Sequence, residues 1–417
     1  MRQSQHGQFS GQNSTAERDD RVKLKRLPED FQVDELSQVS PSSGPFALYR
    51  LTKQSIGTPE VINSVVDRWK IPRRRISYGG LKDKHALTTQ FVTVHHGPKK
   101  PLSQRSFELE YLGQVKKSFV PADIDGNRFT ITLRDMTVEE VERAQSAAED
   151  VRRDGLPNYF DEQRFGSLGA SGEWIARPWC LGDWERTLWL ALADPHPDDR
   201  SNDKKQKAIL RDHWGRWVEC KQALDRSHRR SIVTFLADKE AAGKPIDFRG
   251  AFCNLNVDLR GLYLSAFQSA LWNRMLTQRL TENAAPNSII PFELKSGPAC
   301  FVTSFLSPWG NSAVAPIEDE LPLPSARGKL EEGPTLDLLN AVVAEEGLEK
   351  RQLRVKYPRD SFFSKSNRKT TIDVPDLEFE SFDDDLYPKR KKVRLIFDLP
   401  RGSYATILVK RLTTGSE

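Results

Sequence analysis

Alternating hydrophobic and polar positions predict several β-strands near the two ends of the chain. The segment 24–33 ends in alternating hydrophobic and polar residues. The segments 47–53 and 91–94 contain β-branched and aromatic residues, which are typical of strands. The strand pattern continues from 107 to 133. It returns over 393–410, which we interpret as a strand, a turn and then either a second strand or a helix.

Hydrophobic residues spaced three and four positions apart predict helices between these strands. The first helix is expected to begin at Thr58, which would cap it, and to end before Pro72. Further helices are expected over 138–153, 204–224 and 265–280. We interpret the tryptophans of 204–224 as core residues rather than as stacking platforms.

The first twenty residues do not follow either pattern. Residues 1–20 are rich in Gln, Ser, Gly and Asn and contain almost no aliphatic side chain. Burial in such a segment cannot offset the entropy that ordering would remove, so we expect a disordered N-terminal tail. The whole chain of 417 residues is long enough for two or three domains.

Charge and cysteine content narrow the class of protein. A net charge of +5 is compatible with a polyanionic partner but does not require one. The cysteines lie far apart, without a CxxC pair or a His at ligand spacing, which disfavours a disulfide framework or a zinc site and favours a reducing compartment. They are Cys180, Cys220, Cys253 and Cys300. No apolar run is long enough to span a membrane and no signal core is visible, so we expect a cytoplasmic protein.

A loop within 79–90 carries candidate chemistry. A pair of glycines precedes the triplet Lys82, Asp83 and Lys84, and a strand pattern follows it. We expect a tight loop that presents Asp83 at the mouth of a sheet, with the two lysines keeping the carboxylate ionised. An ionised, positioned carboxylate can act as a nucleophile or as a general base. The alternative for such a triplet is a solvated turn of mixed charge.

This loop resembles the G-x-K-D-K-x-A-x-T signature of the TruD family of pseudouridine synthases, whose Asp is catalytic. Further stretches resemble motifs of that family in the family's order. They are L-K-x-x-P-E-D-F within 24–33, G-N-x-F-x-x-x-L at 126–133, N-Y-F-x-x-Q-R-F-G within 155–166 and L-P-x-G-S-[FY]-A-T within 393–410. The resemblance covers nearly all of the chain after residue 20.

The resemblance implies roles for single residues. Asp83 would be catalytic, and Lys25 would support it electrostatically. Phe31 would line the uridine pocket, Asn127 would contact the edge of the uracil, and Tyr404 would lie against the base. Each of these three substrate-binding residues has a purely structural alternative: Phe31 as a core residue, Asn127 as a local hydrogen-bonding group and Tyr404 as a cap on the edge of the core.

Arg164 and three basic clusters are the candidates for binding phosphate. Arg164 is expected to bind RNA or to anchor its loop, although the aromatic residues around it equally suit a packing elbow. The clusters at 73–75, 226–230 and 389–392 could neutralise phosphates or form ordinary solvated surface. The last of them also resembles a nuclear-localisation run.

The resemblance implies an α+β fold with two domains. A pseudouridine-synthase catalytic domain, a mixed, largely antiparallel sheet flanked by helices, would comprise 21–157 and 358–417. An inserted α+β TRUD domain would comprise 158–357. RNA would bind in the cleft between the two domains.

The implied activity is the isomerisation of uridine to pseudouridine in RNA. The target that the resemblance implies is uridine 13 in the D-arm of tRNA. This reaction needs no cofactor or metal, and we expect a monomer with no membrane partner. A non-catalytic RNA-binding or RNA-folding protein could use the same cleft, but it would not need Asp83. A glycosidase or nucleosidase is disfavoured because no second acid accompanies Asp83 in these motifs.

Overall fold

The computed structural model describes residues 22–306 and 317–414, so the tail expected over 1–20 lies outside the described residues. The chain divides into two compact units. The first unit is Met1–Glu142 with Glu378–Phe397, and the second unit is Arg143–Leu377 with Asp398–Glu417. These units differ in their boundaries from the catalytic and inserted domains expected from the sequence, and that division into domains stays a prediction.

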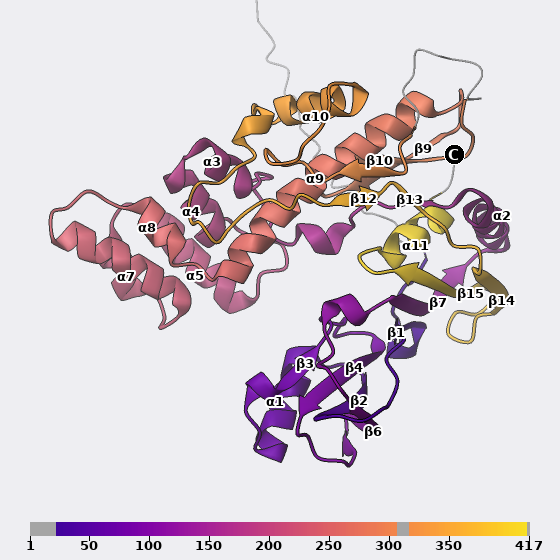
Figure 1. The fold of residues 1–417 in the computed structure, drawn as a ribbon. Coiled ribbons are helices and arrows are strands. Elements are labelled where there is room, and N and C mark those ends of the chain that lie inside the picture. Colours follow the sequence, from indigo (N-terminus) through magenta and orange to yellow (C-terminus); the bar gives the residue numbers. More distant parts are fainter. Residues whose placement is uncertain (1–21, 307–316, 415–417) are drawn as a thin grey trace, which may run out of the picture. The chain divides into compact units, whose positions relative to one another are not determined.

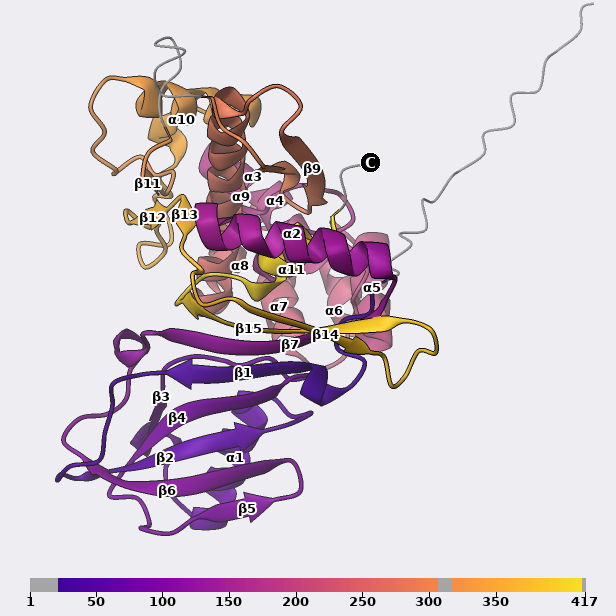
Figure 2. The ribbon, with the colours of Figure 1, turned by 90° about the vertical axis from the view of Figure 1, so that its right-hand side faces the viewer.

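A nine-stranded mixed sheet dominates the first unit (Figure 1). Its strands are β1 (Phe31–Leu36), β2 (Phe46–Lys53), β3 (Ile76–Tyr78), β4 (Leu87–His95), β5 (Leu102–Gln104), β6 (Phe107–Val115), β7 (Gly126–Met136), β14 (Glu378–Asp383) and β15 (Lys391–Pro400). They lie in the order β14-β15-β7-β1-β4-β2-β6-β5, with β3 paired to β4 (Figure 2). β1 and β4 run parallel, while β1–β7, β2–β4 and β2–β6 are antiparallel. The expected mixed, largely antiparallel sheet is therefore confirmed.

Helix α1 (Thr58–Trp69) packs on β2 and β4 and closes the core of this sheet. Thr58 does not cap the helix, because the N-cap is Gly57 and Thr58 is the first helical residue. The Thr58 side chain is buried, donates to the Gln90 side chain at 2.9 Å and accepts from the Lys82 main-chain N–H at 3.2 Å. It therefore ties the start of α1 to the loop of Asp83, which is why it is not available as a cap.

Helices and short hairpins build the second unit. Helix α2 (Val138–Asp154) begins in the first unit and ends in the second. The other helices are α3 (Ala176–Leu181), α4 (Trp184–Leu192), α5 (Ser201–Asp212), α6 (Trp217–Ala223), α7 (His228–Ala241), α8 (Phe248–Cys253), α9 (Val257–Asn283), α10 (Pro334–Glu345) and α11 (Ala405–Thr413). The paired strands are β8 (Leu156–Pro157) with β13 (Thr371–Ile372), β9 (Ile289–Leu294) with β10 (Gly297–Val302), and β11 (Glu320–Pro322) with β12 (Asn367–Lys369). Short 3-10 helices occur at Pro28–Asp30, Arg73–Arg75, Pro121–Asp123, Glu162–Phe165 and Lys350–Gln352.

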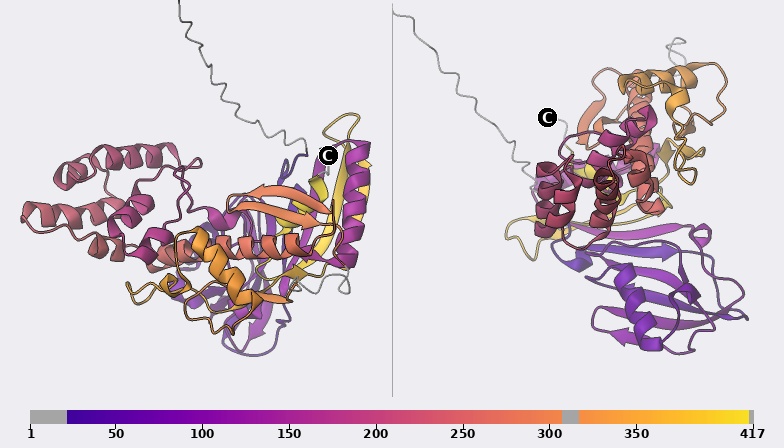
Figure 3. Two further views of the ribbon diagram at one scale, coloured as in Figure 1. Left: turned by 90° about the horizontal axis from the view of Figure 1, so that it is seen from above. Right: turned by 90° about the vertical axis from the view of Figure 1, so that its left-hand side faces the viewer.

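Helix α9 is the central element of the second unit. It contains the expected helix 265–280 and extends it at both ends. Asn256 caps it by accepting from the Asp258 N–H, and Phe267, Leu271 and Trp272 are among its fully buried residues. The β9–β10 hairpin (orange) lies along α9 (coral) in the left view of Figure 3. The length of α9 thus follows from burial on several sides rather than from one apolar stripe.

The single helix expected over 204–224 is wrong, because the chain forms α5 and α6 with a break between them. Gly215 adopts a φ of +87° at this break, a conformation that glycine allows and that a continuous helix does not contain. The apolar pattern persists across the break because each helix buries its own residues, Leu210 in α5 and Trp217 and Cys220 in α6. Trp217 is fully buried, which confirms its interpretation as a core residue. The same interpretation is wrong for Trp214, which is half-buried and donates from Nε1 to the Glu185 carboxylate at 3.0 Å. Over 393–410 the chain forms β15, a turn and α11, so the helical alternative is the correct one.

Candidate active site

Asp83 lies in the loop between β3 and β4, and both of its carboxylate oxygens are held. Lys25 Nζ donates to Oδ2 at 2.5 Å, and the main-chain N–H of His85 donates to Oδ1 at 2.9 Å. The Asp83 side chain is 24% exposed. The carboxylate is therefore fixed in position and still reachable from solvent.

The surroundings of Asp83 favour its ionised form. Partial burial by itself would raise the pKa of the carboxyl, but the hydrogen bonds from Lys25 and His85 and their charges outweigh it and lower the pKa. The expectation that Lys82 and Lys84 perform this task is wrong. Within the described residues the cation on the Asp83 carboxylate is Lys25, from a segment 58 residues earlier, while Lys82 turns to other partners and Lys84 is exposed.

Lys25 also joins Phe31 to this group. Its main chain has a φ of +58°, in the left-handed region that few non-glycine residues adopt. Its Nζ lies 4.1 Å from the centre of the Phe31 ring, within the range of a cation–π interaction. Phe31 is only 5% exposed and contacts Phe129 edge to face at 6.2 Å. Phe31 is thus a core residue and at the same time a neighbour of the Lys25–Asp83 pair.

Lys53, which the sequence analysis did not select, lies beneath the Asp83 loop. It is 1% exposed, and its Nζ donates to the main-chain carbonyl oxygen of Asp83 at 2.6 Å. Burial lowers the pKa of Lys53 to about 8, although the charges of Asp83 and Glu60 oppose this shift. Lys53 falls on the inward side of β2 together with Ala47, Tyr49 and Leu51. A lysine at an inward position of an alternating strand is the sequence signal that could have identified it.

Lys82 connects a buried carboxylate to Asn127. Its Nζ lies 3.1 Å from Glu35 Oε2 and also donates to Asn127 Oδ1. The Glu35 side chain is completely buried, and its Oε1 accepts from the Phe91 N–H at 2.9 Å. Because Lys82 holds the carbonyl oxygen of the Asn127 amide, the NH₂ group of that amide is directed elsewhere as a donor. Glu35 shares the inward side of β1 with Phe31, so the same signal applies to it.

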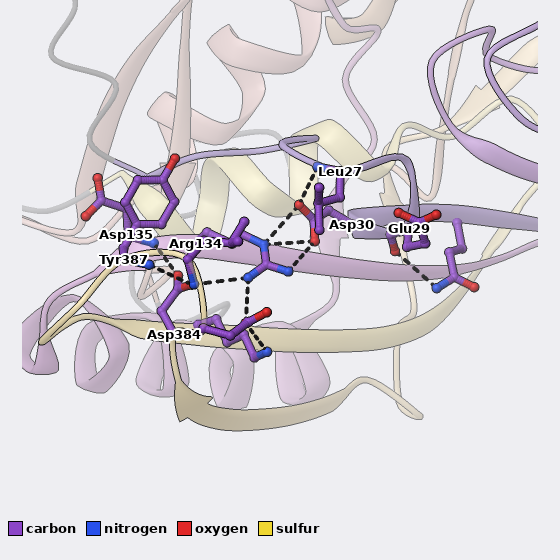
Figure 4. Close-up of polar contacts among 11 residues, drawn as sticks. Leu27, Glu29, Asp30, Arg134, Asp135, Asp384 and Tyr387 are labelled. Carbon is purple, nitrogen blue, oxygen red and sulfur yellow. Dashed lines mark hydrogen bonds and ion pairs between the residues drawn. The ribbon is translucent and has the colours of Figure 1, made fainter.

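An ion cluster anchors the segment that carries Lys25 and Phe31 (Figure 4). Arg134 Nε of β7 donates to both oxygens of Asp30 at 2.9 and 3.0 Å. Arg134 Nη1 donates to Asp384 at 3.1 Å and to Asp385 at 2.8 Å, in the connection between β14 and β15. Asp30 also accepts from the Leu27 N–H at 2.8 Å. Arg134 thus fixes the chain just before β1 to β7 and to the connection between β14 and β15.

Tyr404 and Arg164 belong to the second unit and meet at Phe160. The Tyr404 and Phe160 rings are 6.3 Å apart and edge to face, and the Arg164 guanidinium lies 5.5 Å from the Phe160 ring. Arg164 Nε donates to Ser269 Oγ at 3.1 Å. Burial raises the pKa of Tyr404, and the charges of Arg164 and Arg368 oppose it. The expected site residues therefore form two groups, Lys25, Phe31, Asp83 and Asn127 in the first unit and Arg164 and Tyr404 in the second.

Within 22–306 and 317–414, no three His, Cys, Asp or Glu side chains come together as a metal site. The same part of the chain contains no helix whose length and apolar character would suit a membrane span. The four cysteines are free thiols. The expectation that no cofactor is needed stays a prediction.

Comparison with known proteins identifies relatives along nearly the full chain. A protein of Methanococcus maripaludis named "Probable tRNA pseudouridine synthase D 1" is 30% identical over 94% of this chain and 99% of its own length. The tRNA pseudouridine synthase D of Leptospira interrogans is 29% identical over 93% of this chain and 95% of its own. A crystal structure of a Methanosarcina mazei protein designated tRNA pseudouridine synthase D (TruD) has the same fold, with a TM-score of 0.69 at 24% identity over 94% of this chain and 93% of that one.

A family model also matches nearly the full chain. The model of the family "tRNA pseudouridine synthase D (TruD)" matches residues 15–412, which include the loop of Asp83 and the segment of Tyr404. The chain therefore belongs to the TruD family of tRNA pseudouridine synthases, a family of isomerases.

Proposed function

We propose that this protein isomerises uridine to pseudouridine in tRNA, with Asp83 as the catalytic residue. The observation that carries the proposal is the Asp83 carboxylate, which Lys25 and the His85 N–H hold ionised while it stays accessible. Nucleophilic attack at a carbon atom and removal of a proton both require an ionised carboxylate in a fixed position. Membership in the TruD family supports the same reaction.

The reaction rearranges one nucleoside without an oxidant or reductant. The N1–C1′ bond of uridine breaks, the uracil turns, and C5 bonds to C1′. The C5 proton is lost and N1 becomes protonated, so the composition of the nucleoside is unchanged. Asp83 would either attack C1′ as a nucleophile or remove the 2′ proton as a base, and Lys25 would keep its carboxylate charged in both cases.

The other expected residues would hold the base during this step. The uridine must leave its stack to reach a carboxylate in a loop. Phe31 would pack against the base, Tyr404 would restrain it, and the amide of Asn127 would read its edge. The contact from Lys82 supports this role of Asn127, because it fixes which end of the amide can donate.

The proposed target is uridine 13 in the D-arm of tRNA, and the proposed binding surface includes Arg164. In this proposal the catalytic domain of 21–157 and 358–417 and the inserted domain of 158–357 bind the RNA together, and the protein acts as a monomer. Arg164 would contribute a charge to the RNA backbone.

The Asp83→Asn variant tests the proposal. Asn has nearly the shape of Asp but cannot act as nucleophile or base, so we expect no pseudouridine in a purified tRNA transcript. The affinity for tRNA should stay within about fivefold of wild type, because only one charge changes. The matched control is Asp67→Asn on the exposed face of α1, which should retain wild-type turnover.

Mapping of the modified position separates the parts of the proposal. Pseudouridine at position 13 with wild type, and none with Asp83→Asn, is the expected result. Modification at another uridine would contradict the target but not the reaction. Wild-type protein that binds tRNA and forms no pseudouridine would favour the non-catalytic RNA-binding alternative.

A further inference from the structure

The second unit contains a cavity of about 770 Å³ whose walls are strongly basic. It lies between the segments 158–164, 362–372 and 400–403. Five of its lining side chains are cations and one is a carboxylate. The cations are Arg164, Lys365, Arg368, Lys369 and Arg401, and the carboxylate is Glu320. An excess of cations in a concave site attracts polyanions.

Arg368 is a half-buried cation of this cavity, and the acceptors of its hydrogen bonds are all neutral oxygens. Its Nε and Nη2 donate to the main-chain and side-chain oxygens of Asn158 at 2.9 and 2.6 Å, and its Nη1 donates to the Gly402 carbonyl oxygen at 2.9 Å. Its guanidinium lies 3.9 Å from the centre of the Phe160 ring. Burial lowers the pKa of Arg368 to about 10, and the nearby charge of Arg164 acts in the same direction while Tyr404 opposes it.

The charges of Arg368 and Arg164 are not balanced by acidic residues. Among the residues that the structure describes, no carboxylate forms an ion pair with either guanidinium. Both side chains are half-buried, and a charge that is partly removed from water is stabilised when a counter-ion lies beside it. The arrangement therefore favours an anionic group from outside the chain as the missing partner.

The rim of the cavity adds an aromatic surface to the basic walls. Phe362 lines the cavity and is 66% exposed, whereas its neighbour Phe363 is buried. Lys365 and Lys369 are exposed on the same rim, and neither forms an ion pair within the described residues. An exposed aromatic ring beside cations is the combination that binds single-stranded nucleic acid, because the base stacks and the phosphate is neutralised.

We propose that this cavity binds one nucleotide of the RNA substrate, with its phosphate against Arg368, Lys365 and Lys369 and its base on Phe362. The proposal rests on the proposed function, since it takes RNA as the substrate. The cavity is large enough for one nucleotide, and the pairing of phosphate with a planar guanidinium suits Arg368.

The test compares a cavity variant with a control of equal charge change. Arg368 also holds Asn158 and Gly402, so the exposed lysines are changed instead. The cavity variant is Lys365→Ala with Lys369→Ala, and the control is Lys244→Ala with Lys329→Ala, two exposed lysines of the second unit outside the cavity. The affinity for a tRNA transcript is measured by fluorescence anisotropy at several salt concentrations.

The cavity variant should bind tRNA at least tenfold more weakly, and its slope of log affinity against log salt should fall by about two, because each lost phosphate contact removes about one counterion. The control should stay within about twofold of wild type. Phe362→Ala should weaken binding without a change in slope, because stacking releases no counterion.

Several outcomes would overturn the proposal. Equal affinities and equal salt slopes for the cavity variant and the control would show that the cavity binds no RNA phosphate. Titration with inorganic phosphate is the second arm, and loss of phosphate binding with unchanged tRNA affinity would identify a site for a free anion instead. Both readouts are binding constants, so they are independent of Asp83. Failure of wild type to bind tRNA would instead contradict the proposed function.

Discussion

Lys53 donates a hydrogen bond to the main-chain carbonyl oxygen of Asp83 at 2.6 Å from a position that is almost completely buried. Asp83 is thus held at two places, at its carboxylate by Lys25 and the His85 N–H and at its main chain by Lys53. A charged donor on a carbonyl oxygen is stronger than a neutral one, so this bond restrains the loop effectively. Lys53 acts on the candidate catalytic residue through its main chain and is a positioning residue.

Replacement of Lys53 by Met should reduce turnover while leaving the fold intact. Met is unbranched and only one atom shorter than Lys, but it cannot donate the hydrogen bond to Asp83, so the loop is free to shift. A misplacement of about 1 Å costs roughly 100-fold in rate, and we expect a fall in kcat of about 10- to 100-fold with tRNA affinity nearly unchanged. Lys84→Met in the same loop is the control. Equal kcat for wild type and Lys53→Met would contradict the positioning role.

The pKa of Lys53 predicts how stability depends on pH. Its pKa is about 8 in the folded protein, whereas the ordinary value for a lysine, which we take for the unfolded chain, is 10.5. Between these two pH values the unfolded chain keeps the proton and the folded protein does not. The free energy of unfolding of wild type should therefore rise with pH over this window, relative to Lys53→Met, by about 1–3 kcal/mol. Urea unfolding at pH 7 and pH 10 measures the difference. A gap between the two proteins that is independent of pH would contradict it.

Replacement of Lys25 by Gln should shift the acid limb of the activity profile. Lys25 lowers the pKa of Asp83, so without it the Asp83 carboxyl keeps its proton to a higher pH. Activity of Lys25→Gln should accordingly fall at a higher pH than activity of wild type as the solution is acidified. Single-turnover rates between pH 3 and pH 8 report this shift. Coincident acid limbs would show that Lys25 does not set the charge of Asp83.

Lys82 should affect both stability and substrate recognition, and these effects can be separated. Lys82→Met leaves Glu35 buried and unpaired, which should lower the free energy of unfolding by about 3–5 kcal/mol. It also releases the amide of Asn127, so KM for tRNA should rise about tenfold, the cost of one hydrogen bond. Adding Glu35→Gln should restore most of the stability but not KM. Recovery of both would show that Lys82 has only a structural role.

Arg134 should be essential for the stability of the first unit. Arg134→Met leaves the buried Asp30 and Asp384 carboxylates without their cation, and the expected loss is about 3–5 kcal/mol in urea unfolding. Arg394→Met is the control, because Arg394 pairs with Glu380 at the surface and such a pair contributes about 1 kcal/mol or less. Similar losses for the two variants would contradict the central role assigned to Arg134.

The strands of the first unit could be predicted from sequence because alternation has a short period. The expected strand 47–53 differs from β2 by one residue, and 138–153 differs from α2 by one. The helix over 204–224 could not be predicted correctly, because its apolar spacing fits one helix as well as two. Only the left-handed conformation at Gly215 separates them, and the sequence shows a glycine without showing its φ.

The central residue of the candidate site could be predicted from the sequence, but the contacts that hold this residue in place could not. The pattern of the loop and the family resemblance selected Asp83, and the resemblance selected Lys25. The partners of Arg134 lie 104 and 250 residues away along the chain, and no local pattern indicates such pairs. Lys53 and Glu35 gave a usable signal, a charge on the inward side of an alternating strand. Such a buried charge indicates that the residue has a partner of opposite charge or a hydrogen-bond partner. Which residue is that partner depends on how the chain folds.

The position of β15 in the sheet affects how the protein is made. β7 pairs with β1 on one side, and its other side is covered by β15, which lies more than 250 residues later in the chain. At ribosomal rates of about 5–20 residues per second, roughly ten to fifty seconds pass between the synthesis of these two strands. During that interval the backbone edge of β7 is open to pairing with other nascent chains. The order of synthesis therefore exposes this sheet to aggregation on the ribosome until the last tenth of the chain has emerged.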